Sequence, residues 1–208
     1  MMDAAYDVPD WLDVSRETSD KLAAFCVLVM RWTPAINLVS KSTGAQIWNR
    51  HLLDSAQIFS LLPSGATHWA DLGSGGGFPG LVISILAESQ APDLSVTLVE
   101  SDRRKSVFLT EAARTLGLRT KVLTQRIEEI QPLNADVLSA RALAPLTVLC
   151  GFAARHLAES GTAIFQKGAN HAEEVAEARK SWAFDLQTHP SKTDSTAVVL
   201  AMKAIRHV

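Results

Sequence analysis

The sequence predicts an α/β fold: a mostly parallel seven-stranded sheet with helices on both faces, an N-terminal helical segment and a C-terminal antiparallel hairpin. Three observations predict it. Strand-like and helical runs alternate from about residue 68, a glycine cluster follows the first strand, and two strand-like runs close the chain. The 208 residues suffice for one domain with a sizeable core. We therefore expect a single domain over 1–208, formed by a helical segment, 1–62, and an α/β core, 63–208.

The first sixty residues predict two helices. Four apolar residues recur at the i, i+3, i+4 and i+7 spacing of an amphipathic helix: Leu22, Phe25, Cys26 and Val29. Pro34 is expected to end or kink this helix just before the Asn-Leu-Val stretch at 37–39. A second helix is expected from about Gln46 to Leu61, where the Pro-Ser-Gly run at 63–65 breaks it.

The remainder alternates between strands and helices. Strands are expected at about 68–71, 94–100, 119–124, 136–140 and 162–166. Helices are expected at 81–87, from an Asp102 cap to Leu116, and at 145–158. Two further strands, 182–189 and 196–205, with a turn at 192–194, predict an antiparallel hairpin on the sheet edge.

Composition and charge exclude several classes of protein. The formal net charge of -2 excludes a protein that grips nucleic acid by bulk positive charge. The charge is nevertheless uneven, since residues 101–126 hold seven basic and two acidic side chains. Apolar runs fall short of the roughly 18–20 residues of a membrane span, and the acidic start is unlike a secretory signal. We expect a soluble cytoplasmic protein with reduced cysteines.

The most informative stretch is the glycine cluster at 71–80, Asp-Leu-Gly-Ser-Gly-Gly-Gly-Phe-Pro-Gly. Glycines between a strand and a helix let the backbone turn tightly and approach a ligand closely. Read from Gly75, the spacing is G-x-G-x-x-G, which also occurs in dinucleotide-binding proteins. The cluster therefore predicts a nucleotide-type cofactor but does not by itself choose among cofactors.

Two carboxylates bear on that choice. Glu100 ends the next expected strand, where it can accept hydrogen bonds from the ribose hydroxyls of either NAD or S-adenosylmethionine. Asp71, two residues before the first glycine, favours S-adenosylmethionine. An NAD-dependent oxidoreductase would also need room for a second nucleotide half and a substrate domain. We favour S-adenosylmethionine and keep NAD(P) as the alternative.

The sequence lacks the residues that several other chemistries require. No G-K-[ST] follows the glycines, so a phosphate-binding loop of the Walker type is excluded. The histidines show no metal-ligand spacing, and we expect no metal. Neither Cys26 nor Cys150 follows a proline, as a nucleophile for carbon methylation of a base would. The Pro-Pro-aromatic element of exocyclic-amine methylation is also missing, because residues 139–145 read Ser-Ala-Arg-Ala-Leu-Ala-Pro.

Several separated motifs then suggest a family. They are Trp32 with 36–40 (Ile-Asn-Leu-Val-Ser), 50–55 (Arg-His-Leu-Leu-Asp-Ser), 71–80, 100–105 with 108–109, 126–128, 139–142 and 167–168. In these motifs, and in their order, the chain resembles the bacterial GidB/RsmG family of small-subunit ribosomal RNA (guanine-N7) methyltransferases. The likeness spans about residues 25–170.

The resemblance implies a class I, Rossmann-like methyltransferase fold that uses S-adenosylmethionine. It also implies a guanine in 16S ribosomal RNA, usually numbered nucleotide 527, as the substrate. Together with the glycine loop it gives these cofactor-binding candidates: Asp71, Gly73, Gly75, Gly77, Phe78, Glu100, Ile127, Glu128 and Arg141. A methyltransferase that acts on a small molecule or a protein would keep the same cofactor site and is the alternative.

The expected chemistry needs no general base. Guanine N7 carries a lone pair and no proton, so the enzyme has only to align N7 with the methyl group. The neighbouring O6 accepts hydrogen bonds, and Arg or Lys is its natural donor. Arg141 and Lys167 each end an expected strand, where ligands gather in such sheets. We expect one of them to hold O6.

The RNA-binding candidates are six polar or basic residues: Asn37, Arg50, His51, Arg103, Arg104 and Lys105. The alternative for Arg50 is an i, i+4 ion pair with Asp54, and for His51 a structural position under the glycine loop. The basic run at 103–105 follows Glu100 at the cofactor end of the sheet, which favours phosphate contact over a solvated helix face. The expected partner is 16S RNA or the small ribosomal subunit, bound by a monomer.

Overall fold

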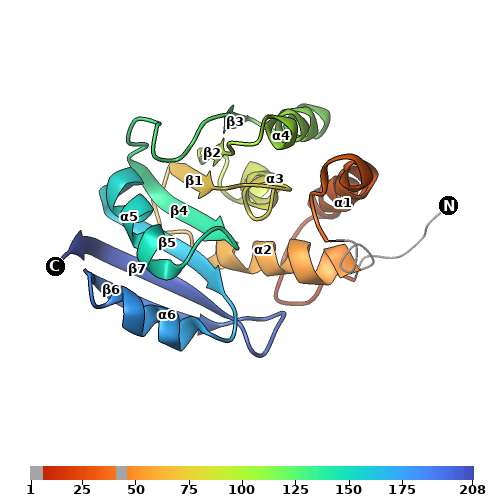
Figure 1. Cartoon of the computed structure of the whole chain (residues 1–208). Helices are drawn as coiled ribbons and strands as arrows, with labels where there is room; N and C mark the ends of the chain where they lie inside the picture. Colours follow the sequence, from red (N-terminus) through yellow and green to blue (C-terminus); the bar gives the residue numbers. More distant parts are fainter. Residues whose placement is uncertain (1–6, 41–45) are drawn as a thin grey trace.

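A computed structural model describes residues 7–40 and 46–208. Its centre is a seven-stranded sheet with the strand order β3-β2-β1-β4-β5-β7-β6 (Figure 1). The strands are β1 His68–Leu72, β2 Ser95–Val99, β3 Thr120–Leu123, β4 Ala135–Arg141, β5 Leu157–Lys167, β6 Trp182–Pro190 and β7 Val198–His207. β3, β2, β1, β4 and β5 pair in parallel, whereas β7 pairs antiparallel with both β5 and β6. The predicted fold class is confirmed, including the antiparallel hairpin at the edge.

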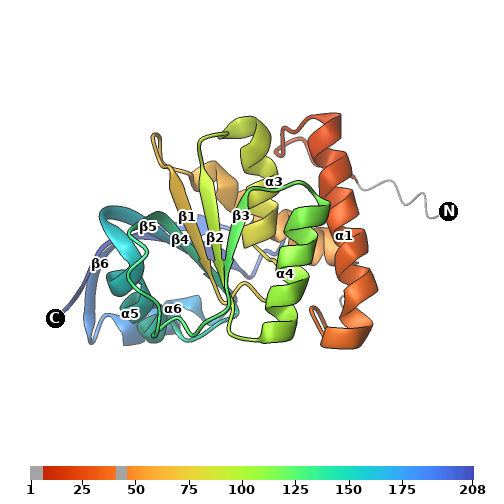
Figure 2. The same cartoon turned by 90° about the horizontal axis from the view of Figure 1, so that it is seen from above.

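Helices cover both faces of the sheet. They are α1 Arg16–Ile36, α2 Asp54–Ala56, α3 Gly80–Gln90, α4 Arg103–Thr115, α5 Leu146–His156 and α6 His171–Ala178. Figure 2 shows α1, α3 and α4 on one side of the sheet and α5 and α6 on the other. Two buried clusters fill these layers, one around Phe25 and Trp69 and the other around Phe165 and Leu149. No helix in the described ranges is long and apolar enough to cross a membrane.

The first helix ends where it was expected to end. α1 includes Pro34 in its last turn and ends at Ile36, with Asn37 as a left-handed cap. The prediction that Pro34 ends the helix just before Asn37 is therefore confirmed. So near the end, a proline removes only one helical hydrogen bond, that of its own missing N–H. The N–H of Asn37 still reaches the Thr33 carbonyl at 2.9 Å.

The second expected helix exists, but its winding changes along its length. A π-helical stretch η2, Trp48–Leu53, leads into α2, and a 3₁₀ stretch η3, Gln57–Leu61, completes it. Figure 1 shows them as one continuous helix around the label α2. Short π-helical stretches often lie at functional sites.

Two differences concern the later part of the chain. α6 was not predicted: it is a helix of eight residues after β5. Its sequence is rich in alanine and glutamate, both good helix formers, so its composition carries a local signal. β5 also begins five residues earlier than expected, at Leu157, where an irregular register near Ala135 lets it pair with β4. This extension follows from pairing between distant segments, for which a local pattern gives no signal.

Candidate functional site

Two cavities lie side by side at the carboxyl ends of the parallel strands. The first, of about 700 Å³, is lined by the glycine loop, Glu100, the 125–128 segment and the Phe152 side chain. The second, of about 1000 Å³, is lined by the ends of β4 and β5, by Arg50 and Asp54, and by the β6–β7 turn. Residues 141–144 border both cavities. This is the edge of an open α/β sheet at which ligands bind.

The glycine loop is fixed from several sides. The N–H groups of Gly73 and Ser74 donate to the Val99 carbonyl at 2.8 and 3.1 Å. Gly75 and Gly77 have positive φ values of 55° and 85°, which other residues rarely adopt. A side chain at Gly80 would collide with Leu98 and with the Asp71 carboxylate. The loop is therefore held in one shape before any ligand arrives.

Asp71 supports this loop from beneath. It is fully buried, and it accepts hydrogen bonds from Ser139 Oγ at 2.7 Å and from the Gly80 N–H at 3.2 Å. Burial raises the pKa of its carboxyl to about 6. Asp71 does not line the first cavity, and neither does Gly77, whose Cα faces Phe25 and Leu81. Both residues were predicted to bind the cofactor, and the structure places both behind the loop.

Glu100 has the geometry expected of a ribose-binding carboxylate. It lines the first cavity, where Oε2 accepts from the Gly75 N–H at 2.9 Å and Oε1 from the Asp102 N–H at 2.8 Å. A carboxylate has about four lone-pair sites, so two backbone bonds fix its orientation and leave capacity for two hydroxyl donors. The residues present at this position therefore fit a nucleoside.

The far end of the first cavity suits a flat ring. Ile127, Val148 and Phe152 supply apolar surface, and Glu128 supplies a polar edge. The Ile127 carbonyl accepts a hydrogen bond from His156 Nε2 at 3.0 Å, which ties this segment to the end of α5. Ile127 and Glu128, two of the predicted cofactor-binding residues, therefore lie at this end of the first cavity.

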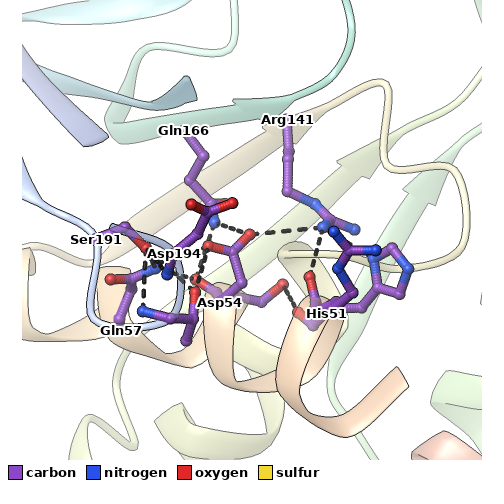
Figure 3. Close-up of polar contacts among 10 residues, drawn as sticks. His51, Asp54, Gln57, Arg141, Gln166, Ser191 and Asp194 are labelled. Carbon is purple, nitrogen blue, oxygen red and sulfur yellow. Dashed lines mark hydrogen bonds and ion pairs between the residues drawn. The ribbon is translucent and has the colours of Figure 1, made fainter. Parts of the chain in front are cut away.

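Arg141 separates the two cavities (Figure 3). Its Nη1 lies 3.0 Å from His51 Nδ1, 3.5 Å from Asp54 Oδ2 and 3.5 Å from the Arg50 carbonyl. Its guanidinium carbon lies 5.4 Å from the centre of the Phe78 ring. Arginine can only donate, so His51 Nδ1 is the acceptor and the ring proton is on Nε2. Burial and two neighbouring cations lower the pKa of His51 to about 4, which agrees with a neutral ring.

Lys167, the other expected base-binding residue, is engaged differently. Its Nζ donates to the Ala144 carbonyl at 3.0 Å and to Glu174 Oε2 at 2.6 Å. The same Glu174 oxygen accepts from the Leu146 N–H at 2.8 Å, at the start of α5. The Lys167 side chain is only 10% exposed. Lys167 therefore fastens α6 to the 144–146 segment in the wall of the second cavity.

The predicted RNA-binding residues do not form one cluster. His51 and Lys105 border the first cavity and Arg50 borders the second. Asn37 caps α1, and its left-handed backbone conformation, at φ 50°, is a structural role of its own.

The three basic residues at the start of α4 also lie in different places. Arg103 borders a shallow separate pocket beside Trp32, whereas Lys105 borders the first cavity. Arg104 is exposed, with Nη2 at 3.9 Å from Asp102, and Asp102 caps the helix as predicted.

Sequence reasoning missed one central residue, Asp54. The i, i+4 spacing suggests a pair with Arg50, but in the described residues Asp54 pairs with Arg141. Its other partners are Gln57, Gln166 and Thr193. The available signal was the Arg-His-x-x-Asp-Ser motif itself. No group of histidine, cysteine or acidic residues that could hold a metal is found within 7–40 and 46–208.

Several solved structures share this architecture. A TehB-like SAM-dependent methyltransferase from Corynebacterium glutamicum superposes with a TM-score of 0.55 at 14% identity, covering 87% of this chain and 98% of that chain. TYW2 of Pyrococcus horikoshii, solved in complex with MeSAdo, gives 0.58 at 12% identity over 74% of this chain and 62% of that chain. The fold is that of the class I S-adenosylmethionine-dependent methyltransferases.

The sequence comparisons narrow the class to a family. Residues 18–200 match the family described as GidB, rRNA small subunit methyltransferase G. A Ribosomal RNA small subunit methyltransferase G from Cereibacter sphaeroides is 52% identical over 201 residues, 97% of each chain. One from Ruegeria pomeroyi is 49% identical over 203 residues, 97% of this chain and 99% of the relative. The chain belongs to the rRNA small subunit methyltransferase G (GidB) family.

Proposed function

We propose that this protein transfers a methyl group from S-adenosylmethionine to N7 of a guanine in 16S ribosomal RNA, the position numbered 527 in the family that it resembles. The observation that carries the proposal is the pair of adjoining cavities with Arg141 between them. One cavity has the carboxylate and apolar slot of a nucleoside site. The other opens to solvent beside it and has room for a base together with part of its backbone.

In the first cavity the residues fit S-adenosylmethionine. Glu100 would hold the ribose, Ile127 and Glu128 would flank the adenine, and Gly73, Gly75 and Phe78 would border the methionine part. Asp71 and Gly77 would act on the ligand through the shape of the loop. When bound, S-adenosylmethionine supplies a methyl group on a positively charged sulfur, ready for transfer to a nucleophile.

In the second cavity, the protein has to align the guanine N7 with the methyl group. N7 needs no proton removed, so no catalytic dyad is required. Arg141 is the better donor to O6, because Nε and Nη2 have no hydrogen-bond partner among the described residues. Lys167 is occupied by Ala144 and Glu174, so we assign it to the cavity wall.

RNA phosphates would contact the basic side chains around the two cavity mouths. Arg50 lines the second cavity, Lys105 and His51 line the first, and Arg103, Arg104 and Asn37 lie outside both. The proposal places a monomer in the cytoplasm with 16S RNA or the small subunit as its partner.

The test is methyl transfer from labelled S-adenosylmethionine to small subunits and to naked 16S RNA from cells that lack this protein. Borohydride and aniline treatment then cuts RNA at 7-methylguanosine. One cut at the expected guanine would establish the cofactor, the atom and the substrate together. Label without that cut would overturn the N7 assignment. No label in either RNA, with cofactor binding intact, would favour a protein or small-molecule substrate.

A further inference from the structure

Asp54 is the point at which four separate elements meet (Figure 3). Its Oδ2 accepts from Gln166 Nε2 in β5 at 2.6 Å and lies 3.5 Å from Arg141 Nη1 at the end of β4. Its Oδ1 accepts from Gln57 Nε2 at 2.8 Å and from Thr193 Oγ1, in the β6–β7 turn, at 3.3 Å. A single carboxylate thus joins the helical segment to three parts of the second cavity.

The helix winding brings three acceptors to the same arginine nitrogen. The π-helical stretch ends at Leu53, and Asp54 starts the α-helical turn. On this segment the Arg50 carbonyl, His51 Nδ1 and Asp54 Oδ2 all contact Arg141 Nη1. In a regular α-helix, residues four apart share a face, so Arg50 would have been the natural partner of Asp54. The π turn instead directs Asp54 to Arg141.

The anchoring of Nη1 determines where the rest of the guanidinium points. The group is planar and rigid, so holding one nitrogen limits the direction of its other donors. The guanidinium carbon of Arg141 also lies over the Phe78 ring, 5.4 Å from its centre. Nε and Nη2 have no polar partner in the described part of the chain, and neither is a buried, unsatisfied atom. They are therefore open to the cavities that Arg141 borders.

The pair also balances charge. The Arg141 and Asp54 side chains are 20% and 18% exposed, so water screens them weakly. Methylation leaves a positive charge on the guanine ring, and an unpaired cation beside it would oppose that charge. Asp54 removes the net charge and leaves the hydrogen-bond donors in place.

We propose that Asp54 is a positioning residue for methyl transfer: through its contact with Nη1 it orients the Arg141 guanidinium so that Nε and Nη2 face the bound guanine. Asp54 does not itself touch the reacting atoms. This inference rests on the proposed function, since it takes the guanine of that proposal as the ligand of Arg141.

A double-mutant cycle tests whether Asp54 acts through Arg141. The single-turnover rate of methyl transfer to RNA is measured for wild type, Asp54→Asn, Arg141→Ala and the double variant. We expect Asp54→Asn to slow transfer about 30-fold in the wild-type background and less than about threefold in the Arg141→Ala background, as coupled residues do. The dissociation constant of S-adenosylhomocysteine, measured by calorimetry, should change little between wild type and Asp54→Asn.

Asp136→Asn is the matched control. Asp136 accepts from the Thr67 N–H, Thr67 Oγ1 and the His68 N–H at 2.8, 3.1 and 3.0 Å, at the amino ends of the central strands β1 and β4. Its substitution also removes a hydrogen-bonded carboxylate and should lower the melting temperature without slowing transfer. A second readout is the arginine ¹⁵N spectrum, in which the Arg141 guanidinium should rotate slowly in wild type and faster in Asp54→Asn.

Several outcomes would overturn the inference. They are an equal loss of rate in both backgrounds, no loss in Asp54→Asn, and unchanged Arg141 rotation in Asp54→Asn. If Asp54→Asn does not fold, Arg141→Lys provides a second test, because it keeps the cation but not the oriented donors. A wild-type rate of methyl transfer in Arg141→Lys would also overturn the inference. Failure of the wild type to methylate RNA would instead count against the proposed function.

Discussion

The charge state of His51 is a direct consequence of where its ring lies. The ring is partly buried, and Arg141 and Arg50 add two nearby cations, so the pKa falls to about 4. A neutral ring can accept the hydrogen bond from Arg141 that a protonated ring would lose. His51 therefore keeps its contact with Arg141 throughout the physiological range.

The corresponding expectation is that the His51 ring does not titrate between pH 5 and pH 8. Ring proton shifts in two-dimensional NMR spectra, assigned with a His51→Asn variant, would show this. The same protein unfolded in urea serves as the control, because its histidines should titrate near the ordinary value of about 6.5. A His51 midpoint near that value in the folded protein would contradict the assignment.

Asp71 makes a second prediction, about stability. Its folded pKa, about 6, lies above the ordinary value of 3.8, so the folded state binds its proton more tightly than the unfolded chain. Its contribution to stability is therefore fully present below about pH 4 and is lost as pH rises through 6. The free energy of unfolding should fall over this window relative to Asp71→Asn, by about 3 kcal/mol at most.

Denaturant titrations of wild type and Asp71→Asn between pH 4 and pH 8 measure this difference. Asn keeps the size of the side chain and cannot titrate, so other groups cancel in the comparison. A difference that is constant with pH, or that grows in favour of wild type at higher pH, would show that the Asp71 pKa is not raised.

Among the elements, α4 supports the prediction about RNA. Asp102 fixes its first turn by accepting from the Arg104 and Lys105 N–H groups at 2.8 and 3.2 Å. Changing Arg103, Arg104 and Lys105 together to alanine should weaken RNA binding and flatten its salt dependence. The slope of log affinity against log salt should fall by up to about 2, at roughly 0.7 for each single-strand phosphate that the variant no longer neutralises. Fluorescence titrations with an RNA fragment at several salt concentrations measure the slope.

An unchanged slope would show that this helix face meets only solvent. Lys105→Ala alone is the informative partner of the triple variant, because only Lys105 of the three borders the first cavity. Arg114→Ala, farther along the same helix and paired with Glu111 at 2.7 Å, controls for the general loss of positive charge.

The elements that local patterns predicted are those whose causes are local. The Asp102 cap, the glycine loop and the alternating strands follow from short-range spacing, and the structure has all of them. Pro34 was expected to end or kink the first helix just before Asn37, and α1 ends there, at Ile36. α6 was missed although its sequence, rich in alanine and glutamate, favours a helix, and contacts such as Lys167–Glu174 hold it against other segments.

The same distinction between local and tertiary causes applies to the functional site. The motif 50–55 could be recognised, but the partner of Asp54 could not, because a π turn changes which residues share a helix face. Likewise, Asp71 and Gly77 belong to the cofactor loop in sequence, while their places behind it depend on Ser139, Phe25 and Leu81. The spacing of the glycines identified the loop, whereas only the tertiary structure shows which of its residues line the cavity.

In the whole molecule, the two cavities are lined by different parts of the sheet that share only β4. The first depends on β1, β2 and the end of β4, and the second on β4, β5 and the β6–β7 turn. Asp194 closes that turn by accepting from the Thr196 N–H and Oγ1 at 2.9 and 2.7 Å. Changes to the turn should therefore separate substrate binding from cofactor binding.

Asp194→Ala is the test of this separation. The released turn should raise KM for RNA about tenfold and leave the dissociation constant of S-adenosylhomocysteine within about twofold, because a disordered turn affects only the ligand that it faces. Steady-state kinetics and calorimetry measure the two quantities. Equal effects on both ligands would mean that the two cavities respond as one unit.

The chain order of these cavities has a consequence for biosynthesis. Every described residue that lines the first cavity lies between Leu38 and Phe152, whereas the second also needs 193–198 in the β6–β7 turn. A chain emerges from the ribosome N-terminal end first, and a single domain folds as a unit. The residues of the cofactor cavity are thus made before those of the outer wall of the base cavity. A nascent chain therefore contains the residues that receive the methyl donor before it contains all those that receive the base.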